Sequence, residues 1–454
     1  MKNISIFSLT VIFLLLITTI NLIAQSDLGI NGYIKTDNRL RYDSKEFTWN
    51  ENRLNLKFEG APSDKYHFFS EVRLRGFGFP NVTQSSDLQR QEKDKVYRWG
   101  LEFREAYLDL YQFGLENLDL RIGRQIISWG TADKLNPTSN ISPDDLEDIF
   151  NFGEQLGTNA LKASYYLGDV TLTGVFVPVF TPATLPLGDF ASAFAPPMDL
   201  PPGVLPRNFS DSIILPENKL TESSQFAFKA ATNLLGYDVS LSYFKGRDDL
   251  PLVDKVTITP VDTLGTIDID TELIYPKMQV IGADFAGSIG SVGFWGEGAL
   301  FIPDKVEMST FMQTQMGLLP QATSIALDDK PYFRYVIGGD YTFKNGLYLN
   351  AQFLHGFIHE RGEENLNDYI AFRFEKKFFN DELKIVPFGG AIAINDWNNI
   401  DNDYGFLGNP EITYYPSDNV ELILGAYWLE GKGTNMFSQI KKNDELYVKV
   451  KVSF

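Results

Sequence analysis

Few side chains in this sequence could carry out covalent or metal-assisted chemistry. The chain has no cysteine and three histidines, His67, His355 and His359. The last two are four residues apart and beside Glu360, a spacing that suits a zinc site on a helix. Here the pair falls at the end of an expected strand, where that spacing does not converge, so we expect no metal site. Because no His is near a suitable Ser and Asp, we also expect no catalytic triad, no enzymatic activity and no cofactor.

The side chains with the clearest pattern are charged residues that alternate with apolar ones. Val72 and Leu74 alternate with Glu71, Arg73 and Arg75. In a strand, successive side chains point to opposite faces, so this segment has one apolar and one charged face. The same alternation recurs in three other segments, residues 53–59, 118–123 and 370–375. We therefore predict that these segments are strands with one polar face in contact with water.

From Leu28 onward, short turns and long connections follow one another in strict succession. The short turns contain Gly, Asn, Asp or Pro, which suit turn backbones. They are Ala61–Lys65, Gly114–Asn117, Gly168-Asp169, Leu235–Tyr237, Gly287–Ser291, Lys344–Gly346, Asn380-Asp381 and Pro416–Asp418. The long connections are near residues 43–50, 78–98, 130–157, 181–222, 248–275, 303–331, 359–367, 396–404 and 431–443. This rhythm is typical of outer-membrane barrels and predicts an all-β, antiparallel up-and-down transmembrane barrel of about 18 strands, or 16 if one pair is loop.

The two ends of the chain agree with this fold class. Residues 1–25 have a basic start, a long apolar run and a small residue, the layout of a secretory signal peptide, with an uncleaved helical anchor as the alternative. Residues 26–454 then form a single barrel. The last segment, Leu446–Phe454, has apolar residues at every second position and ends in an aromatic. It resembles the closing strand of bacterial outer-membrane barrels, in which the terminal Phe, here Phe454, is part of the signal for the barrel-assembly machinery.

Composition narrows the function further. The chain contains 36 Phe, 21 Tyr and 37 Gly, a mixture that suits aromatic girdles and a curved, crowded wall in outer-membrane lipid. A formal charge of −19 excludes a nucleic-acid partner on electrostatic grounds. Ion selectivity does not follow from that sum, because loop and pore charges are pooled in it. The expected location is the outer membrane of a Gram-negative cell.

One stretch carries a family resemblance. A strand ending in Gly-Arg-Gln is followed by Trp-Gly and then Asn-Pro, here Gly123, Arg124, Gln125, Trp129, Gly130, Asn136 and Pro137. This series resembles a porin-like family of outer-membrane barrels of poorly characterised function, similar in style to the alginate-export barrels. The match is densest over residues 104–182. The resemblance implies an outer-membrane barrel and supplies no substrate.

Charged residues on neighbouring strands predict one wall of a pore constriction. Placing Arg or Lys on the lipid face at mid-depth costs about 2–4 kcal/mol, so the charged faces must line the lumen. The predicted wall consists of Arg73, Arg75, Arg104, Arg121 and Arg124, with Glu71 and Asp119 among the acids beside them. The alternative is solvated wall charges that pair with one another.

Two positions in this wall are ambiguous from the sequence. Arg124 shares a face with Leu120 and Ile122, so either it lies at the membrane interface or a bulge turns it inward. The alternation also slips at Arg104-Glu105, which leaves open which of the two faces the lumen. Trp129, just beyond the strand, suits the interfacial aromatic girdle.

Two long connections could fill the lumen. Residues 130–157 are acidic near their end, and residues 181–222 are unusually apolar and rich in proline. A solvent-exposed loop should not be so apolar unless it packs somewhere, so folding into the barrel is the preferred interpretation. A hydrophobic solute site or contact with a partner chain are the alternatives.

The sequence thus favours a porin-like channel for passive diffusion of small polar solutes that it does not identify. One alternative is an outer-membrane transporter of hydrophobic compounds. Another is a closed structural or surface-interaction barrel. The oligomeric state stays open, because aromatic lipid faces do not reveal subunit contacts.

Overall fold

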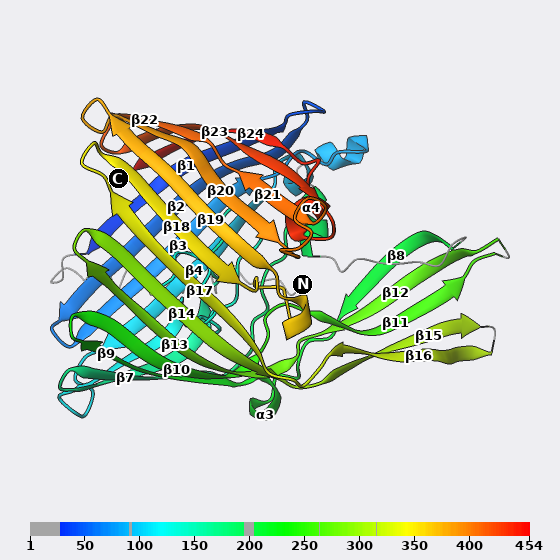
Figure 1. Ribbon diagram of the computed structural model, residues 1–454, viewed down its shortest axis with the longest axis horizontal. Helices are drawn as coiled ribbons and strands as arrows, with labels where there is room; N and C mark the ends of the chain where they lie inside the picture. The colour runs from blue at the N-terminus through cyan, green and yellow to red at the C-terminus, as the bar shows by residue number, and fades with distance from the viewer. Residues whose placement is uncertain (1–27, 90–92, 195–203, 263, 315) are drawn as a thin grey trace.

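The computed structural model describes residues 28–454 except 90–92, 195–203, 263 and 315. The expected signal peptide, residues 1–25, lies outside the described residues. The remainder is a closed antiparallel barrel of 18 strand positions, which confirms the predicted fold class (Figure 1). A smaller five-stranded sheet projects beyond one end of the barrel (Figure 1).

Nineteen strands build the barrel wall. They are β1 (Gly29–Arg41), β2 (Phe47–Ser63), β3 (Tyr66–Phe77), β4 (Trp99–Leu110), β5 (Leu118–Gln125), β6 (Thr158–Leu167), β7 (Val170–Val177), β9 (Gln225–Leu234), β10 (Tyr237–Arg247), β13 (Lys277–Ile289), β14 (Val292–Pro303), β17 (Tyr332–Thr342), β18 (Leu347–His355), β19 (Asp368–Phe378), β20 (Leu383–Ile394), β21 (Tyr404–Gly408), β22 (Glu411–Ser417), β23 (Val420–Lys432) and β24 (Glu445–Ser453).

Two of these strands, β21 and β22, share one position in the wall. Both pair with β20 on one side and with β23 on the other. The break between them contains Pro410, which has no amide hydrogen to donate to a ladder. Nineteen strands therefore fill eighteen positions.

The last strand closes the barrel against the first. Residues Tyr33 to Arg41 of β1 pair with Ser453 to Glu445 of β24. The backbones of Gly32 and Phe454 also exchange two hydrogen bonds, of 2.9 and 3.0 Å. Alternate residues of β24 point outward, as its sequence predicts, with Leu446, Val448 and Val452 exposed.

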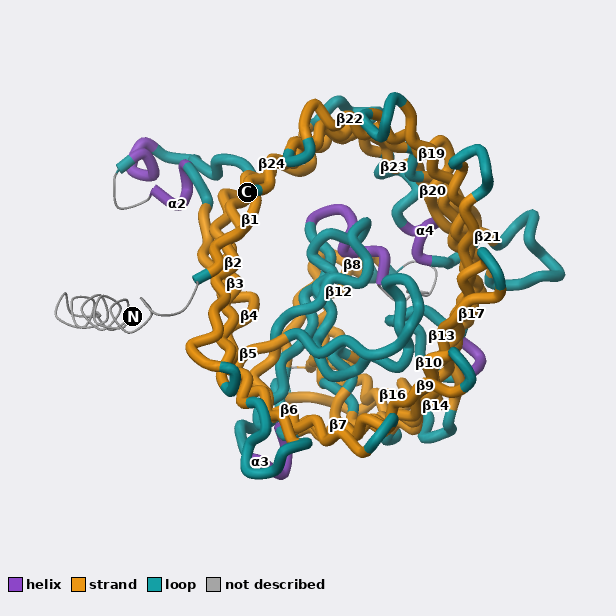
Figure 2. The backbone as a smooth tube through the Cα atoms, turned by 90° about the vertical axis from the view of Figure 1, so that its left-hand side faces the viewer, coloured by secondary structure: helices purple, strands orange, loops and turns teal. Residues whose placement is uncertain are grey.

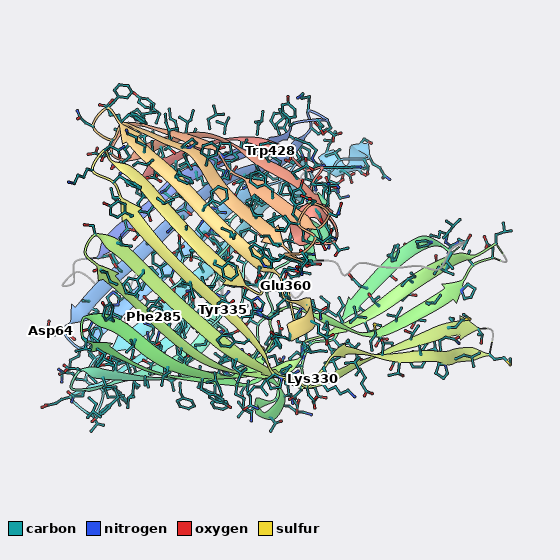
Figure 3. All side chains as sticks on the ribbon, viewed as in Figure 1. Asp64, Phe285, Lys330, Tyr335, Glu360 and Trp428 are labelled. Carbon is teal, nitrogen blue, oxygen red and sulfur yellow. The ribbon has the colours of Figure 1, made fainter. Side chains whose placement is uncertain are left out.

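The wall is apolar outside and polar inside. Outward-facing residues such as Phe285 and Trp428 are exposed, and they lie along the outer surface with Tyr335 (Figure 3). The inner face carries charged and amide side chains that are shielded from solvent, among them Asp37, Arg39, Asn55, Glu51, Arg73, Arg104, Asp109, Asp284, Glu297, Arg334 and Gln352. The polarity of the wall is therefore that of a membrane-spanning barrel with a wet lumen.

The connections divide between two ends. The eight predicted short turns lie at one end, here called the short-turn end, where the strand ladders terminate in tight hairpins. The opposite, long-loop end carries the short helices η1 (Ser85–Leu88), α2 (Lys93–Val96), η3 (Gly188–Phe194), α3 (Leu220–Ser223), η4 (Glu363–Asn365) and α4 (Met436–Gln439). In the described part of the chain, the helices are too short to cross a membrane.

The projecting sheet has the strand order β16-β15-β11-β12-β8. Its strands are β8 (Leu205–Ile213), β11 (Leu252–Pro260), β12 (Thr266–Ile274), β15 (Val306–Thr314) and β16 (Gly317–Leu327). They come from three connections that the sequence pattern treats as loops, residues 181–222, 248–275 and 303–331. That expectation is incomplete, because the sheet depends on the parallel pairs β11–β15 and β12–β8, which join different connections. The alternation of apolar and polar residues within one segment does not predict pairing with a strand from a distant connection.

Candidate pore constriction

The connection after β5 folds into the barrel instead of leaving it. We call residues 130–157 the inward segment; in the view along the barrel, loops fill much of the ring of strands (Figure 2). Just before it, the amide of Ile126 donates to Glu105 Oε1 at 2.8 Å, and that of Ile127 to Ser142 Oγ at 2.7 Å. These side chains replace the ladder partners that the backbone loses when it leaves the wall.

Gly130 allows the segment to begin where it does. Its φ is +94°, a backbone region that residues with a Cβ rarely adopt. A Cβ at this position would also lie 2.2 Å from Glu297 Oε2. Trp129, next to it, is 7% exposed and packs in an interior cluster with Ile141 and Val177. Its expected place in the interfacial girdle is therefore wrong, because the chain has already turned inward at this residue.

Arginines of β1, β3 and β4 bind the acids of the inward segment. Arg75 holds Glu147 through two hydrogen bonds of 2.8 and 2.9 Å. Arg39, which is 1% exposed, holds both carboxylate oxygens of Asp148, with Nη1 at 2.8 Å from Oδ1. Two-point guanidinium–carboxylate contacts are strong and geometrically specific. The acidic end of the segment is therefore fixed against one side of the wall.

Arg104 adds a third anchor. Its Nη2 lies 3.0 Å from Glu154 Oε2 and donates to the Gln155 carbonyl at 2.9 Å. The register between β3 and β4 shifts at this point, so that Glu71 faces Glu105 while Val72 faces Phe103. The extra residue is Arg104, and this bulge turns both Arg104 and Glu105 toward the interior. The ambiguity in the sequence pattern is resolved by both residues facing the lumen.

The opposite side of the wall holds the other end of the segment. Glu297 of β14 accepts hydrogen bonds from the Ala132 amide at 3.1 Å and from Thr138 Oγ1 at 2.5 Å. Gln352 of β18 pairs with the backbone of Asp133 through bonds of 3.0 and 3.2 Å. The inward segment therefore crosses the lumen from the arginines of β1–β4 to β14 and β18.

Apolar contacts complete the docking. Phe150 stacks on Tyr427 of β23 with ring centres 3.8 Å apart, and Leu146 and Ile149 are each 2% exposed. Burying a side chain of this size contributes about 1.5–3 kcal/mol. Phe150 also contacts Phe190 of η3, with ring centres 5.0 Å apart. The segment thus has an apolar core of its own inside the barrel.

Two parts of the connection 181–222 lie in different places. In its first part, Asp189 binds Arg41 at 2.8 Å, and Ala193 is fully buried in a second interior cluster, with Ile149 and Tyr427. Residues 195–203 lie outside the described residues. The part that follows is β8 of the projecting sheet. The expectation that this connection fills the lumen therefore holds for the residues up to Phe194. It is wrong for β8, which belongs to the projecting sheet.

The other predicted wall residues are spread along the barrel. Glu71 faces the interior, 3.7 Å from Arg104 Nε, and Arg73 lies 3.8 Å from Glu154. Arg121 pairs with Asp109 at 2.6 Å, apart from the inward segment. Asp119 lies at the short-turn end, where its carboxylate accepts from the Gln112 amide at 2.9 Å. These last two stand away from the crossing point of the inward segment.

Arg124 is misplaced by the sequence interpretation. It lies on the outward face of β5 together with Ile122, which is 46% exposed, and opposite Asn159. Its Nε donates to the Phe103 carbonyl at 2.7 Å. No bulge turns it into the lumen, because the ladder between β5 and its neighbours runs without a register shift. Arg124 therefore does not line the constriction.

Arg39 is one of the wall residues that the sequence interpretation missed. It lies between Asp37 and Asp148, and its guanidinium carbon is 4.5 Å from the Trp49 ring centre. The alternation of β1 marks its face as polar, but nothing local indicates that an acid 109 residues away supplies its partner. Burial alone would raise the pKa of Asp148, but the charge and hydrogen bonds of Arg39 outweigh burial and hold that pKa well below its usual range.

Two cavities flank the inward segment. The larger, of about 320 Å³, lies between the segment and the wall formed by β10, β13, β14, β17 and β18. The smaller, of about 110 Å³, lies on the side of β1–β3 and is lined by Lys35, Arg53, Arg73 and Arg75 together with acids of the segment. Among the described residues, no group of three or more His, Asp or Glu side chains could hold a metal ion.

A family model matches residues 33–403, most of the chain; its description is "Protein of unknown function (DUF1302)". The chain belongs to this family. The similarity in style to alginate-export barrels stays a resemblance. No curated protein matches the sequence.

Several solved structures match nearly the whole chain at low sequence identity. One is OmpF of Salmonella typhi in complex with daunomycin, at 10% identity, with 95% of this chain and 98% of that chain covered and a TM-score of 0.41. Another is OmpT of Vibrio cholerae, folded in vitro, at 9% identity, with 95% and 98% covered and a TM-score of 0.42. A closed barrel with an apolar outer face satisfies all of its backbone groups within lipid. The DUF1302 protein is accordingly an outer-membrane barrel.

Proposed function

We propose that this barrel is a porin-like channel through which small polar solutes diffuse passively, with the inward segment as its constriction. The supporting observation is the crossing of the lumen by residues 130–157, tied to Arg39, Arg75 and Arg104 on one side and to Glu297 on the other. Polar cavities border the segment on both sides. A wet passage with a narrow, charged section is what a diffusion channel needs, and the proposal includes no catalytic step.

Charge distribution at this crossing would select solutes. Lys35, Arg53 and Arg73 line the smaller cavity opposite Asp145 and Glu154 of the segment. Opposed rows of cations and carboxylates set up a field across the passage, which favours solutes whose own charges can align with it. Removing a cation from this row should shift ion selectivity toward cations.

Single-channel recording in planar bilayers tests the proposal. The purified protein is expected to give steady ohmic openings in KCl, and Arg73→Ala should increase cation over anion permeability. Arg124→Ala is the matched control, because it removes the same charge from the outward face. Openings that respond equally to both substitutions would retain the channel and reject the charged constriction. A folded barrel without any openings would reject the channel.

One observation favours a second function, transport of hydrophobic compounds. A row of apolar residues in register crosses all five strands of the projecting sheet, namely Phe209, Ile269, Ile258, Met312 and Leu319. Phe209 and Leu319 are 55% and 46% exposed. Such a face could collect an apolar solute before it enters the barrel. A protein without ohmic openings that restores uptake of a labelled apolar compound to a deletion strain would support this function.

A further inference from the structure

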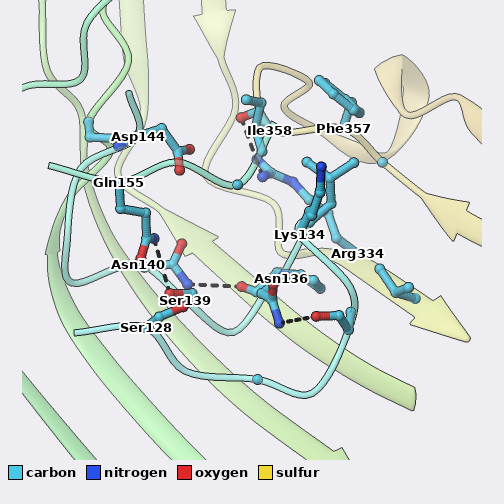
Figure 4. Close-up of a pocket in the computed structure, with 18 of the residues that line it drawn as sticks. Ser128, Lys134, Asn136, Ser139, Asn140, Asp144, Gln155, Arg334, Phe357 and Ile358 are labelled. Atoms are coloured by element: carbon cyan, nitrogen blue, oxygen red, sulfur yellow. Dashed lines mark hydrogen bonds between the residues drawn. The ribbon is translucent and has the colours of Figure 1, made fainter. Parts of the chain in front are cut away.

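The larger cavity is lined by charged side chains of both signs, and some of them have no salt-bridge partner among the described residues. It is bounded by the inward segment on one side and by the end of the wall strands and the Gly356–Ile358 connection on the other (Figure 4). Its volume of about 320 Å³ is near the lower end of the roughly 300–1,000 Å³ that ligand pockets span. Its size therefore suits a small molecule.

Asp144 presents a free carboxylate to this cavity. The backbone amide of Asp144 is bound by Asp249 Oδ2 at 2.7 Å, and its carbonyl accepts from the Thr184 amide at 3.0 Å. Within the described residues, its side chain has neither a hydrogen bond nor a salt bridge, and it points into the cavity (Figure 4). The backbone is thus fixed on both sides while the carboxylate remains available.

Cationic groups without an acid partner lie across the cavity. Lys134 has no ion pair or side-chain hydrogen bond in the described structure, and it stands beside Arg334 in Figure 4. Arg334 is 7% exposed and donates to the carbonyls of Ile358 and Glu360 at 3.4 and 2.8 Å, not to any carboxylate. Its buried Nε has no partner in the described structure. Two positive charges therefore face the cavity with no described acid bound to either.

Lys134 is held in place by its backbone. Its φ is +78°, a left-handed conformation that is strained for a residue with a Cβ and that recurs at functional sites. Its carbonyl would lie 2.6 Å from a Cβ on Gly153, so a glycine is needed there to accommodate it. The position of Lys134 at the cavity is therefore built into the segment.

Amide side chains supply acceptors between the two charged sides. Asn136, Asn140 and Gln155 line the floor, and each uses its NH₂ group on a neighbour: the Ala132 carbonyl at 3.0 Å, the Pro137 carbonyl at 2.9 Å and Ser139 Oγ at 3.2 Å. Their side-chain oxygens accept no hydrogen bond within the described residues. A ligand with an N–H donor can thus be bound by these oxygens and by Asp144 together.

We propose that this cavity binds a zwitterionic solute of the amino acid or short peptide class. Its ammonium group faces Asp144 and the amide oxygens, and its carboxylate faces Lys134 and Arg334. Burial of an unpaired charge is unfavourable. A ligand that neutralises both the acidic and the basic side of the cavity should therefore bind more tightly than a ligand that neutralises only one side. This inference rests on the proposed channel function and names the class of solute that the channel would carry.

The electrostatics of the acidic side agree with an ammonium ligand. Burial, and then the charges of Asp249 and Asp248, raise the pKa of Asp144 well above its usual range, against a smaller opposite effect of Arg334. Burial and Asp248 also raise the pKa of Asp249 to about 6, with Arg361 acting against them. An ammonium group stabilises the charged carboxylates, so protons compete with it. Affinity should therefore fall as the pH is lowered from 7 to 5.

Isothermal titration of the whole purified protein in detergent tests the site with L-alanyl-L-alanine as the probe. Its N-acetyl form lacks the ammonium and its amide form lacks the carboxylate, and each should bind at least about tenfold more weakly, equivalent to about 1.4 kcal/mol. Asp144→Asn should abolish the preference over the N-acetyl form, and Lys134→Met the preference over the amide form. Asp211→Asn, in exposed β8, is the control and should change neither preference.

Binding and conductance separate the two proposals. Equal affinity for the three probes, or preferences that survive both substitutions, would overturn the zwitterion site and leave an ohmic channel intact. No measurable binding, from protein that conducts in a bilayer, would do the same. Selective binding by protein that never conducts would retain the site and reject diffusion as the function.

Discussion

Two sets of long connections at the same end of this barrel have opposite fates. The inward segment places Leu146 and Ile149 at 2% exposure and meets three arginines of the wall with matched acids. The projecting sheet pairs three connections with one another and leaves Phe209 and Leu319 open to solvent. Both contain apolar and acidic residues, so composition does not decide between them. The difference is that the barrel wall presents cations at fixed positions to the inward segment and not to the projecting sheet.

That difference has an energetic reason. A carboxylate that moves into the lumen loses hydration, and only a well-placed cationic partner offsets this unfavourable desolvation free energy. Glu147, Asp148 and Glu154 each find such a partner on a separate strand. An acid of the projecting sheet, such as Asp268 beside Arg207, stays in solvent and needs no such match. The inward fold is therefore specified by charge complementarity more than by hydrophobicity.

The largest expected effect comes from reversing this complementarity. In Glu147→Arg combined with Asp148→Arg, the segment would present cations to Arg39 and Arg75 and should leave the wall. We expect single-channel conductance to rise severalfold, because the constriction would widen. The matched control reverses Asp268 and Asp270 of the projecting sheet to Arg and should leave conductance unchanged. A double reversal in the segment with wild-type conductance would show that residues 130–157 do not limit the passage.

Removal of one buried cation should have the next largest effect. Arg39→Met leaves Asp37 and Asp148 without their guanidinium, and breaking a buried pair in this way costs about 3–5 kcal/mol. Urea unfolding in detergent micelles, followed by the loss of heat-modifiable gel mobility, measures the change. Arg207→Met, which breaks an exposed pair in the projecting sheet, serves for comparison. Equal midpoints for the two variants would contradict the assigned role of Arg39.

The sequence predicts the wall of this protein much better than its interior. Alternation and turn residues are local signals, so the apolar face of β24 and the eight hairpins follow from them. Arg73, Arg75 and Glu71 are likewise placed on the inner face by period alone. Arg124 is placed wrongly because the sequence allows a bulge there, whereas the bulge occurs at Arg104 on the preceding strand, β4.

Pairing between distant segments accounts for the rest. Acidity in residues 130–157 is visible in the sequence, but the assignment of Asp148 to Arg39 and of Glu147 to Arg75 depends on the path of the segment through the barrel. The same holds for β8, whose only strand partner in the described structure, β12, comes from another connection. Such contacts depend on how the folded chain brings distant segments together, and a periodic pattern within one segment gives no information about this.

Acid should release the inward segment only at very low pH. The pKa of Asp148 is depressed in the folded protein, so its contribution to docking is complete above the unfolded value of about 3.9 and is lost as the pH falls through the lower folded value. Asp249, whose pKa is raised to about 6, takes up a proton between pH 7 and 5, which favours the buried state. Conductance should therefore stay constant or decrease from pH 7 to 5 and rise below about pH 4. A rise already complete at pH 5 would show that another group controls docking.

The smallest effect is expected from shortening the projecting sheet. Replacing Glu307–Ile325 by a short turn removes the β15–β16 hairpin, which lies at one edge and pairs with the rest of the sheet through β11 alone. Among the described residues, the ion pairs of the inward segment involve none from this hairpin, so conductance and the urea midpoint should match those of the intact protein. Bilayer recording and the gel assay measure both on one preparation. A change in conductance comparable to that of the Glu147 and Asp148 reversal would mean that the two regions act together, and the contrast between them would then fail.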